Sequence, residues 1–289
     1  MKQKQYARLS AQKSGMAPGT LHYVGDKKRD QVTMTLLTYQ DQEIQRLGVE
    51  EVEVKGEGHY VEYYNRQELT EKELERFQMK KDHYYWLMVD GMHDVALIEA
   101  IGQKFGLSDV SLENILNTSI RPCFDVFKAY STIIMKKVDT DANEASHSTL
   151  EVEAEQIGLV IGKHFVITFT ENGLEEKESL IRCLSEGNMK RKDMNYITYL
   201  ILDSIIDQYF VVMEHITEHV EDLETEIIER PTKAAVEKIY HMKKTLLLLQ
   251  KLVWPQREII NAILREKEIL SVNGLQEYFR DLYDNLFQV

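Results

Sequence analysis

Cysteine is scarce in this chain of 289 residues, where only Cys123 and Cys183 occur, far apart and in no CxxC pair. This usage argues against a disulfide framework and against a thiolate metal site. It indicates reduced thiols in a cytoplasmic compartment. The first ten residues are polar, and they lack the apolar region of a signal peptide.

A long hydrophobic run is also missing. The longest apolar stretch, residues 196–213, is interrupted by Asp203 and Asp207, whereas a membrane-spanning helix needs about 20 predominantly apolar residues. The sequence as given therefore predicts a soluble chain. Positive charge is in deficit, since the formal net charge is -13. Such a surface argues against nucleic-acid binding, which needs a basic footprint, and fits a surface that cations neutralise.

Motifs for nucleotide-dependent or nucleophilic enzymes are absent. The pair Gly56 and Gly58 lacks the third glycine and the following helix of a phosphate-binding loop. No GxSxG motif occurs, and no cysteine and histidine share a recognisable spacing. We therefore do not predict an enzyme.

One short motif has two interpretations. His215-Ile216-Thr217-Glu218-His219 matches the HxxEH signature of inverted zinc proteases. Spacing of i and i+4 places both imidazoles on one helix face. A catalytic zinc needs a third protein ligand, and nothing beyond these five residues resembles that family. The alternative, which we favour, is a pair of exposed histidines on an acidic helix.

The first part of the chain, residues 1–190, mixes strand and helix patterns and predicts an α/β domain. Asp94 is placed to cap a helix over 94–105, with Gly106 closing it. A second helix is expected at 112–116, and His164 is expected in a hairpin turn. The stretch 139–149, acidic and rich in serine, predicts a loop. Runs rich in β-branched and aromatic residues predict strands at 20–24, 32–39, 85–89, 127–137, 157–161 and 165–169.

Residues 191–268 predict a helical hairpin. The stretch 193–229 contains neither proline nor glycine, so it predicts one helix about 55 Å long at 1.5 Å per residue. Pro231 marks a turn, and a second helix is expected over 233–267 with a local kink at Pro255. Helices joined by a short turn lie antiparallel.

The two helices of this hairpin carry opposite charge. Residues 192–230 hold ten acidic and two basic residues, and residues 231–268 hold four acidic and eight basic residues. One interpretation is attraction between the two helices across the hairpin. The other is an acidic face exposed for cations, and both can hold.

The last segment, residues 269–289, predicts the start of a further helix. From Leu275 the apolar residues recur at helical spacing up to Val289, without the glycine, asparagine or proline that often ends a helix. We therefore expect the natural protein to continue beyond this point.

Three carboxylates interrupt apolar runs: Glu113, Asp203 and Asp281. An ionised group in such surroundings needs a partner of opposite charge. That partner is either a lysine or arginine or a bound cation. Oxygen ligands with little nitrogen or sulfur nearby suit Mg²⁺ or Ca²⁺.

These runs belong to an ordered set of segments that spans nearly the whole chain and resembles the cytoplasmic part of the CorA family of magnesium and cobalt channels. The matching segments, in chain order, are Pro18-Gly19-Thr20-Leu21, Leu112-Glu113-Asn114-Ile115-Leu116-Asn117, Arg121-Pro122, Phe165-Val166-Ile167-Thr168-Phe169, Asp203 with Asp207-Gln208-Tyr209-Phe210, Glu229-Arg230-Pro231, Trp254-Pro255-Gln256-Arg257-Glu258 and Tyr278-Phe279-Arg280-Asp281-Leu282-Tyr283-Asp284.

The resemblance implies an αβα domain with a mixed sheet, two long antiparallel helices and a stalk helix that runs to the membrane. It also implies a homopentamer around a pore, on the cytoplasmic side of the cell membrane. The two transmembrane helices and the Gly-Met-Asn selectivity motif of the family are absent from this chain. The chain alone is therefore not expected to conduct ions.

The resemblance further implies regulatory Mg²⁺, or Co²⁺, bound between subunits. Glu113 and Asn114 of one subunit would face Asp281 of the next, with Asp203 at a nearby second site. Asn114 departs from the family, which often has aspartate there, so either Glu113 or Asp284 is expected to contribute more to metal binding.

The expected function is a divalent-cation sensor that holds a CorA-like channel closed when Mg²⁺ is bound. Two alternatives remain open from the sequence: the cytoplasmic domain of a related Zn²⁺ transporter, and a free-standing soluble metal-binding regulator.

Overall fold

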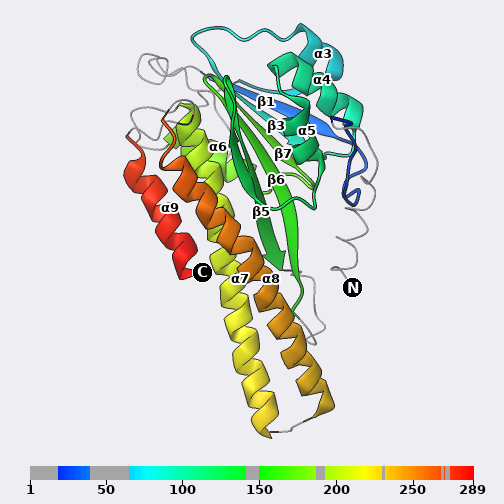
Figure 1. The fold of residues 1–289 in the computed structure, drawn as a ribbon, viewed down its shortest axis with the longest axis vertical. Helices are drawn as coiled ribbons and strands as arrows, with labels where there is room; N and C mark the ends of the chain where they lie inside the picture. Colours follow the sequence, from blue (N-terminus) through cyan, green and yellow to red (C-terminus); the bar gives the residue numbers. More distant parts are fainter. Residues whose placement is uncertain are drawn as a thin grey trace, which may run out of the picture.

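The computed structural model describes residues 19–39, 65–140, 150–186, 193–229, 232–267, 270 and 274–289. A single sheet lies between two layers of helices, and one helical hairpin extends well beyond the sheet (Figure 1). This is the αβα arrangement with a mixed sheet and long helices that the family resemblance implies.

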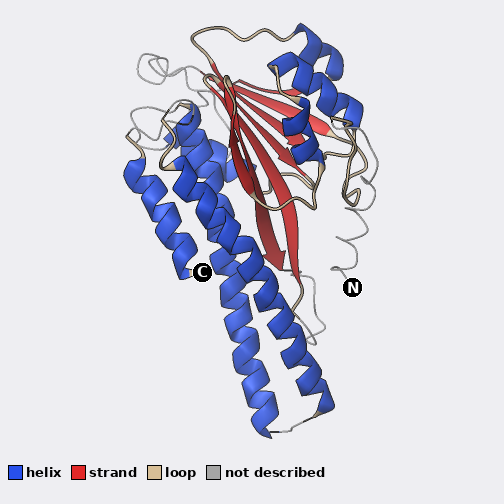
Figure 2. Ribbon diagram, viewed as in Figure 1, coloured by secondary structure: helices blue, strands red, loops and turns tan. Residues whose placement is uncertain are grey.

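The sheet, drawn in red in Figure 2, has seven strands in the order β2-β1-β3-β7-β6-β5-β4. Strands β3 and β7 pair in parallel and all other neighbours pair antiparallel, so the sheet is mixed. Both faces of the central strands are buried, which explains why β7 reads as a continuous apolar run. The strands are β1 Thr33–Tyr39, β2 Asn65–Leu69, β3 Tyr84–Asp90, β4 Cys123–Val126, β5 Tyr130–Thr140, β6 Val152–Gly162 and β7 Phe165–Thr170.

The predicted helix ends near Asp94 and Gly106 are confirmed. The side chain of Asp94 accepts a hydrogen bond from the backbone N–H of Leu97, and Gly106 closes the helix in the left-handed conformation with φ of 69°. A residue with a Cβ atom rarely adopts that conformation. The helices are α3 Glu71–Arg76, α4 Val95–Phe105, α5 Asp109–Leu116, α6 Lys177–Glu186, α7 Met194–Glu229, α8 Lys233–Ile263 and α9 Gln276–Gln288.

Two apolar cores form, one on each face of the sheet. Helices α3, α4 and α5 pack on one face, where Leu87 and Ile134 are buried. Helices α6, α7, α8 and α9 cover the other face, where Trp86 and Ile133 are buried. Neighbouring residues of one strand therefore belong to different cores, as the alternation of side chains along a strand requires.

Helix α7 is long and apolar enough to cross a membrane when judged by length and composition alone, and it is the one described helix that meets this test. The helix that runs through the core of a soluble domain passes the same test. Half of its most apolar stretch is buried within the chain, where Ile201 and Ile205 join the core on the sheet.

Some elements differ from the sequence-based predictions. The strand expected at 20–24 is wrong, because this segment forms only one bridge, between Val24 and Asn117. Strands β2 and β4 and helices α3 and α6 were not predicted. The loop expected at 139–149 begins later, since β5 continues through Thr140, and residues 141–149 lie outside the described part of the chain. Gly56 and Gly58, and the turn expected at Pro231, also lie outside the described part of the chain.

A buried tyrosine connects the sheet to both long helices. Tyr209 of α7 is fully buried, and its hydroxyl donates to the backbone oxygen of Lys136 in β5 at 2.8 Å. The same hydroxyl accepts a hydrogen bond from Gln256 Nε2 in α8. This one hydroxyl thus joins α7 to both β5 and α8 through buried hydrogen bonds.

We expect Tyr209→Phe to lower the free energy of unfolding by about 1–3 kcal/mol, because it leaves buried polar groups unpaired. Urea denaturation followed by circular dichroism measures this loss. Tyr240→Phe is the matched control, since Tyr240 is 58% exposed and surface changes typically stay within about 0.5 kcal/mol. Equal effects of the two substitutions would contradict the assigned role of Tyr209.

Candidate metal site

Three carboxylates gather where α9 packs on α7. Asp203 and Asp207 lie one turn apart on α7, and Asp281 lies on α9. Burial, together with the negative charges of Asp207 and Asp281, raises the pKa of Asp203 to about 6. Partial burial and Asp281 also raise the pKa of Asp207. Every charged neighbour that shifts these two groups is acidic, so this cluster favours a cation.

Aromatic side chains hold α9 against α7 beside these carboxylates. The ring of Tyr199 lies 5.3 Å from that of Tyr278 and 6.0 Å from that of Phe279. Tyr199 also hydrogen-bonds Asp203. Phe279 is fully buried, which fixes the face that α9 turns toward α7. Asp203 and Asp281 are therefore brought together within one chain.

Asp284 follows Asp281 by three residues on α9 and is exposed. Residues three apart are neighbours on a helix surface. Asp284 thus lies on the same side of α9 as Asp281, where it can add negative charge to the cluster.

The other two predicted residues lie elsewhere. Glu113 and Asn114 are half-buried on α5, which packs on the opposite face of the sheet from α7 and α9 (Figure 1). The chain therefore does not bring Glu113 and Asn114 to Asp281. Among the described residues, no group of three or more His, Cys, Asp or Glu side chains is placed to hold one metal ion.

The histidines of the HxxEH motif are hydrogen-bonded to protein groups. His215 Nδ1 lies 2.8 Å from Thr140 Oγ1, and His219 Nδ1 lies 3.2 Å from the backbone oxygen of His215. Each imidazole thus has one nitrogen engaged by the fold. Both histidines are half-buried, so the expectation that they are exposed is wrong. Their hydrogen bonds to protein groups nevertheless give no support to a zinc protease site.

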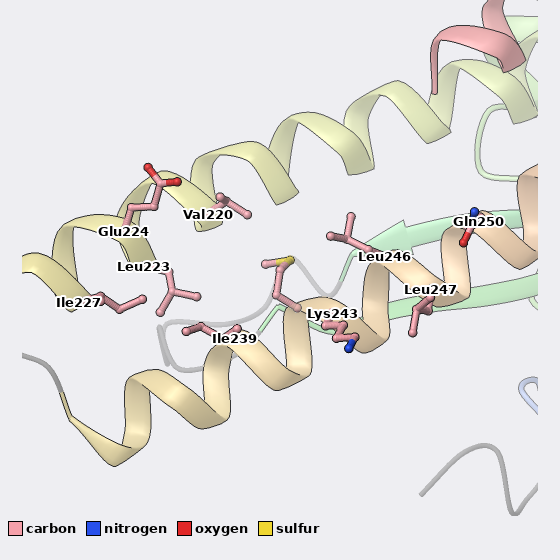
Figure 3. Close-up of a pocket in the computed structure, with 10 residues that line it drawn as sticks. Val220, Leu223, Glu224, Ile227, Ile239, Lys243, Leu246, Leu247 and Gln250 are labelled. Carbon is pink, nitrogen blue, oxygen red and sulfur yellow. The ribbon is translucent and has the colours of Figure 1, made fainter.

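A cavity of about 520 Å³ lies between the distal halves of α7 and α8 (Figure 3). Its lining is mostly apolar and includes Leu223, Ile227 and Ile239. The carboxylate of Glu224 points away from it in Figure 3. A small hard cation needs oxygen ligands, so this cavity is not a cation site.

Comparison with known proteins identifies the family. A family model described as CorA-like Mg2+ transporter protein matches residues 81–289. The chain is 30% identical to the cobalt/magnesium transport protein CorA of Thermotoga maritima over 98% of this chain and 73% of that protein. This chain belongs to the CorA family.

Solved structures agree with this family in fold. The soluble domain of CorA from Methanocaldococcus jannaschii superposes with a TM-score of 0.60 at 17% identity, covering 88% of each chain. The cytoplasmic domain of ZntB from Vibrio parahaemolyticus superposes with a TM-score of 0.56 at 13% identity, covering 71% of this chain and 78% of that one. At such identities the likeness shows the fold alone.

Sequence reasoning missed Asp207 as a member of the acidic cluster at the α7–α9 contact. Its spacing of four residues from Asp203 was the available signal, because residues at i and i+4 share a helix face. It also missed the polar side chains under α5, which no local pattern indicates.

The raised pKa of Asp203 predicts a pH-dependent stability. Its folded-state pKa of about 6 lies above the ordinary 3.8, so protonation of Asp203 stabilises the fold. This contribution is complete at low pH and is lost as the pH rises from about 4 through about 6. We expect Asp203→Asn to raise the melting temperature near pH 7, without divalent cations, and to change it little near pH 4.

Asp222→Asn is the matched control for this experiment, because it removes the same charge from an exposed position of the same helix. Thermal melts across the pH range compare the two variants with the unmodified chain. A stabilisation by Asp203→Asn that is independent of pH, or that Asp222→Asn reproduces, would refute the assignment.

Proposed function

We propose that this chain is the cytoplasmic cation-sensing and gating part of a CorA-like Mg²⁺/Co²⁺ channel. The observation that carries the proposal is the acidic cluster of the half-buried Asp203 with the exposed Asp207 and Asp281, whose negative charges repel one another. Membership of the CorA family supports the choice of a divalent cation as the species that relieves this repulsion.

The proposed regulatory site forms between subunits of a homopentamer. Glu113 and Asn114 lie on the opposite face of the sheet from Asp281, so a site that uses all three needs a second copy of the chain. Asp203 and Asp284 complete the acidic surface. These groups offer oxygen ligands only, which suits Mg²⁺, and Asn114 can hydrogen-bond a water that Mg²⁺ retains.

Charge neutralisation then explains gating. Without Mg²⁺ the facing carboxylates repel, and the subunits separate. A bound Mg²⁺ reverses the repulsion and favours a symmetric, closed arrangement. The ion shifts this equilibrium only by its difference in affinity for the two states, so a weakly binding site suits a sensor of cellular Mg²⁺. In this proposal the protein lies at the cytoplasmic side of the membrane, and Mg²⁺ or Co²⁺ is also the transported substrate.

Calorimetric titration with MgCl₂ tests the proposal directly, with native mass spectrometry reporting the oligomer. We expect Mg²⁺ binding by the unmodified chain and a loss of at least about tenfold in affinity for Asp281→Asn, the lower end of the range for lost metal-site partners. Glu277→Gln is the control, since it removes one exposed charge from the same helix.

Absence of Mg²⁺ and Co²⁺ binding would overturn the proposal, and so would an equal loss for Glu277→Gln. A parallel titration with ZnCl₂ tests the Zn²⁺ alternative. Zn²⁺ binding that His215→Gln abolishes, without Mg²⁺ binding, would support that alternative instead.

A further inference from the structure

The last turn of α5 is held by side chains of the sheet beneath it. Lys136 of β5 and Gln156 of β6 are paired across the two strands, so their side chains share a face. Both are buried, with exposed fractions of 4% and 1%. Lys136 Nζ donates to Gln156 Oε1 at 3.0 Å. A buried lysine and a buried glutamine thus form one connected polar group under the helix.

This group bonds the backbone at the end of α5. Gln156 Nε2 donates to the backbone oxygens of Ile115 at 2.8 Å and Asn114 at 3.3 Å. Lys136 Nζ donates to the backbone oxygen of Thr118 at 2.6 Å. The last carbonyls of a helix have no partner within the helix. Here Gln156 supplies a donor to two of them, and Lys136 holds the residue that follows the C-cap.

The segment around Val24 completes the end of the helix. Val24 N–H donates to the backbone oxygen of Leu116 at 2.9 Å, and the backbone N–H of Thr118 donates to Val24 O at 2.9 Å. Beyond it, Glu171 accepts a hydrogen bond from the backbone N–H of Gln156. The whole arrangement is internally satisfied, which a buried polar network must be to stabilise a structure.

Helix α5 depends on these contacts. It has eight residues, and isolated helices shorter than about 12 residues are marginal in water. Its C-cap residue, Asn117, is extended with φ of -101° and ψ of 90°, so the left-handed cap that closes many helices is not used. Donors from the sheet take its place.

We propose that Lys136 and Gln156 are positioning residues of the metal site, which fix the turn of α5 that carries Glu113 and Asn114. This inference rests on the proposed function and adds to it the groups that set the geometry of the site. Neither side chain is proposed to touch the ion. Gln156 acts through the backbone of Asn114 and Ile115, and Lys136 acts through Gln156 and the backbone of Thr118.

Substitution of adjacent lysines tests the proposal. Lys136 and Lys137 are neighbours in β5, both are buried, and they point to opposite faces. Lys137 pairs with Glu176 at 2.9 Å, away from α5. Lys136→Met and Lys137→Met therefore remove the same charge and the same side chain from one strand. Gln156→Met removes the amide that bonds α5 without changing the net charge.

The measurement is calorimetric titration of the full chain with MgCl₂ at a temperature where melting curves show every variant folded. We expect Lys136→Met and Gln156→Met each to weaken Mg²⁺ binding by about tenfold, as lost outer partners of metal ligands do. Lys137→Met should bind as the unmodified chain does. Hydrogen exchange should rise over residues 113–118 in the first two variants and stay unchanged there in Lys137→Met.

Unchanged Mg²⁺ affinity in Lys136→Met and Gln156→Met would overturn this inference and leave the proposed function standing. An equal loss in Lys137→Met would also overturn it, because general destabilisation would then explain the effect. If the unmodified chain binds no Mg²⁺, the proposed function itself fails, and this inference fails with it. Unchanged hydrogen exchange over residues 113–118 in Lys136→Met and Gln156→Met would show that α5 does not depend on these two side chains, and would also overturn the inference.

Discussion

Repulsion among the carboxylates at the α7–α9 contact is the interaction on which the rest of this account depends. The α7–α9 contact places Asp281 beside Asp203 and Asp207, and the half-buried Asp203 loses part of the water that normally solvates its carboxylate. Partial burial of a charge destabilises a fold unless a partner of opposite charge or hydrogen bonds offset the lost solvation. Burial of Phe279, Leu282 and Leu286 holds α9 in place regardless, so the packing keeps the charges together.

The seven-stranded sheet imposes the second constraint. It separates α5 from α7 and α9 and gives each layer its own core. The acidic residues of the two layers can act together only across copies of the chain. In the function proposed above, such a site would respond to both assembly and cation concentration, as gating requires.

Features set by residues close in the sequence could be predicted, whereas long-range contacts could not. The cap at Asp94 and the closing Gly106 were predicted because each acts on its own helix end. Strands β2 and β4 were missed because they are short, lie at the two edges of the sheet and have little alternation. For the site, apolar surroundings marked Asp203 and Asp281, while their relation to Glu113 came only from family resemblance. Lys136 and Gln156 were missed because polar residues inside a strand pattern give no signal of their long-range partners.

Disulfide formation between copies tests the central claim, that the α5 residues of one chain meet α9 of another. In a chain with Cys123→Ser and Cys183→Ser, the pair Glu113→Cys and Asp281→Cys can form a disulfide only if the two Cα atoms approach to about 4–7 Å. The sheet keeps these positions apart within one chain. The account predicts covalent oligomers after oxidation, resolved on a non-reducing gel and absent when either cysteine is present alone. Monomers throughout, under conditions where the chain assembles, would contradict it.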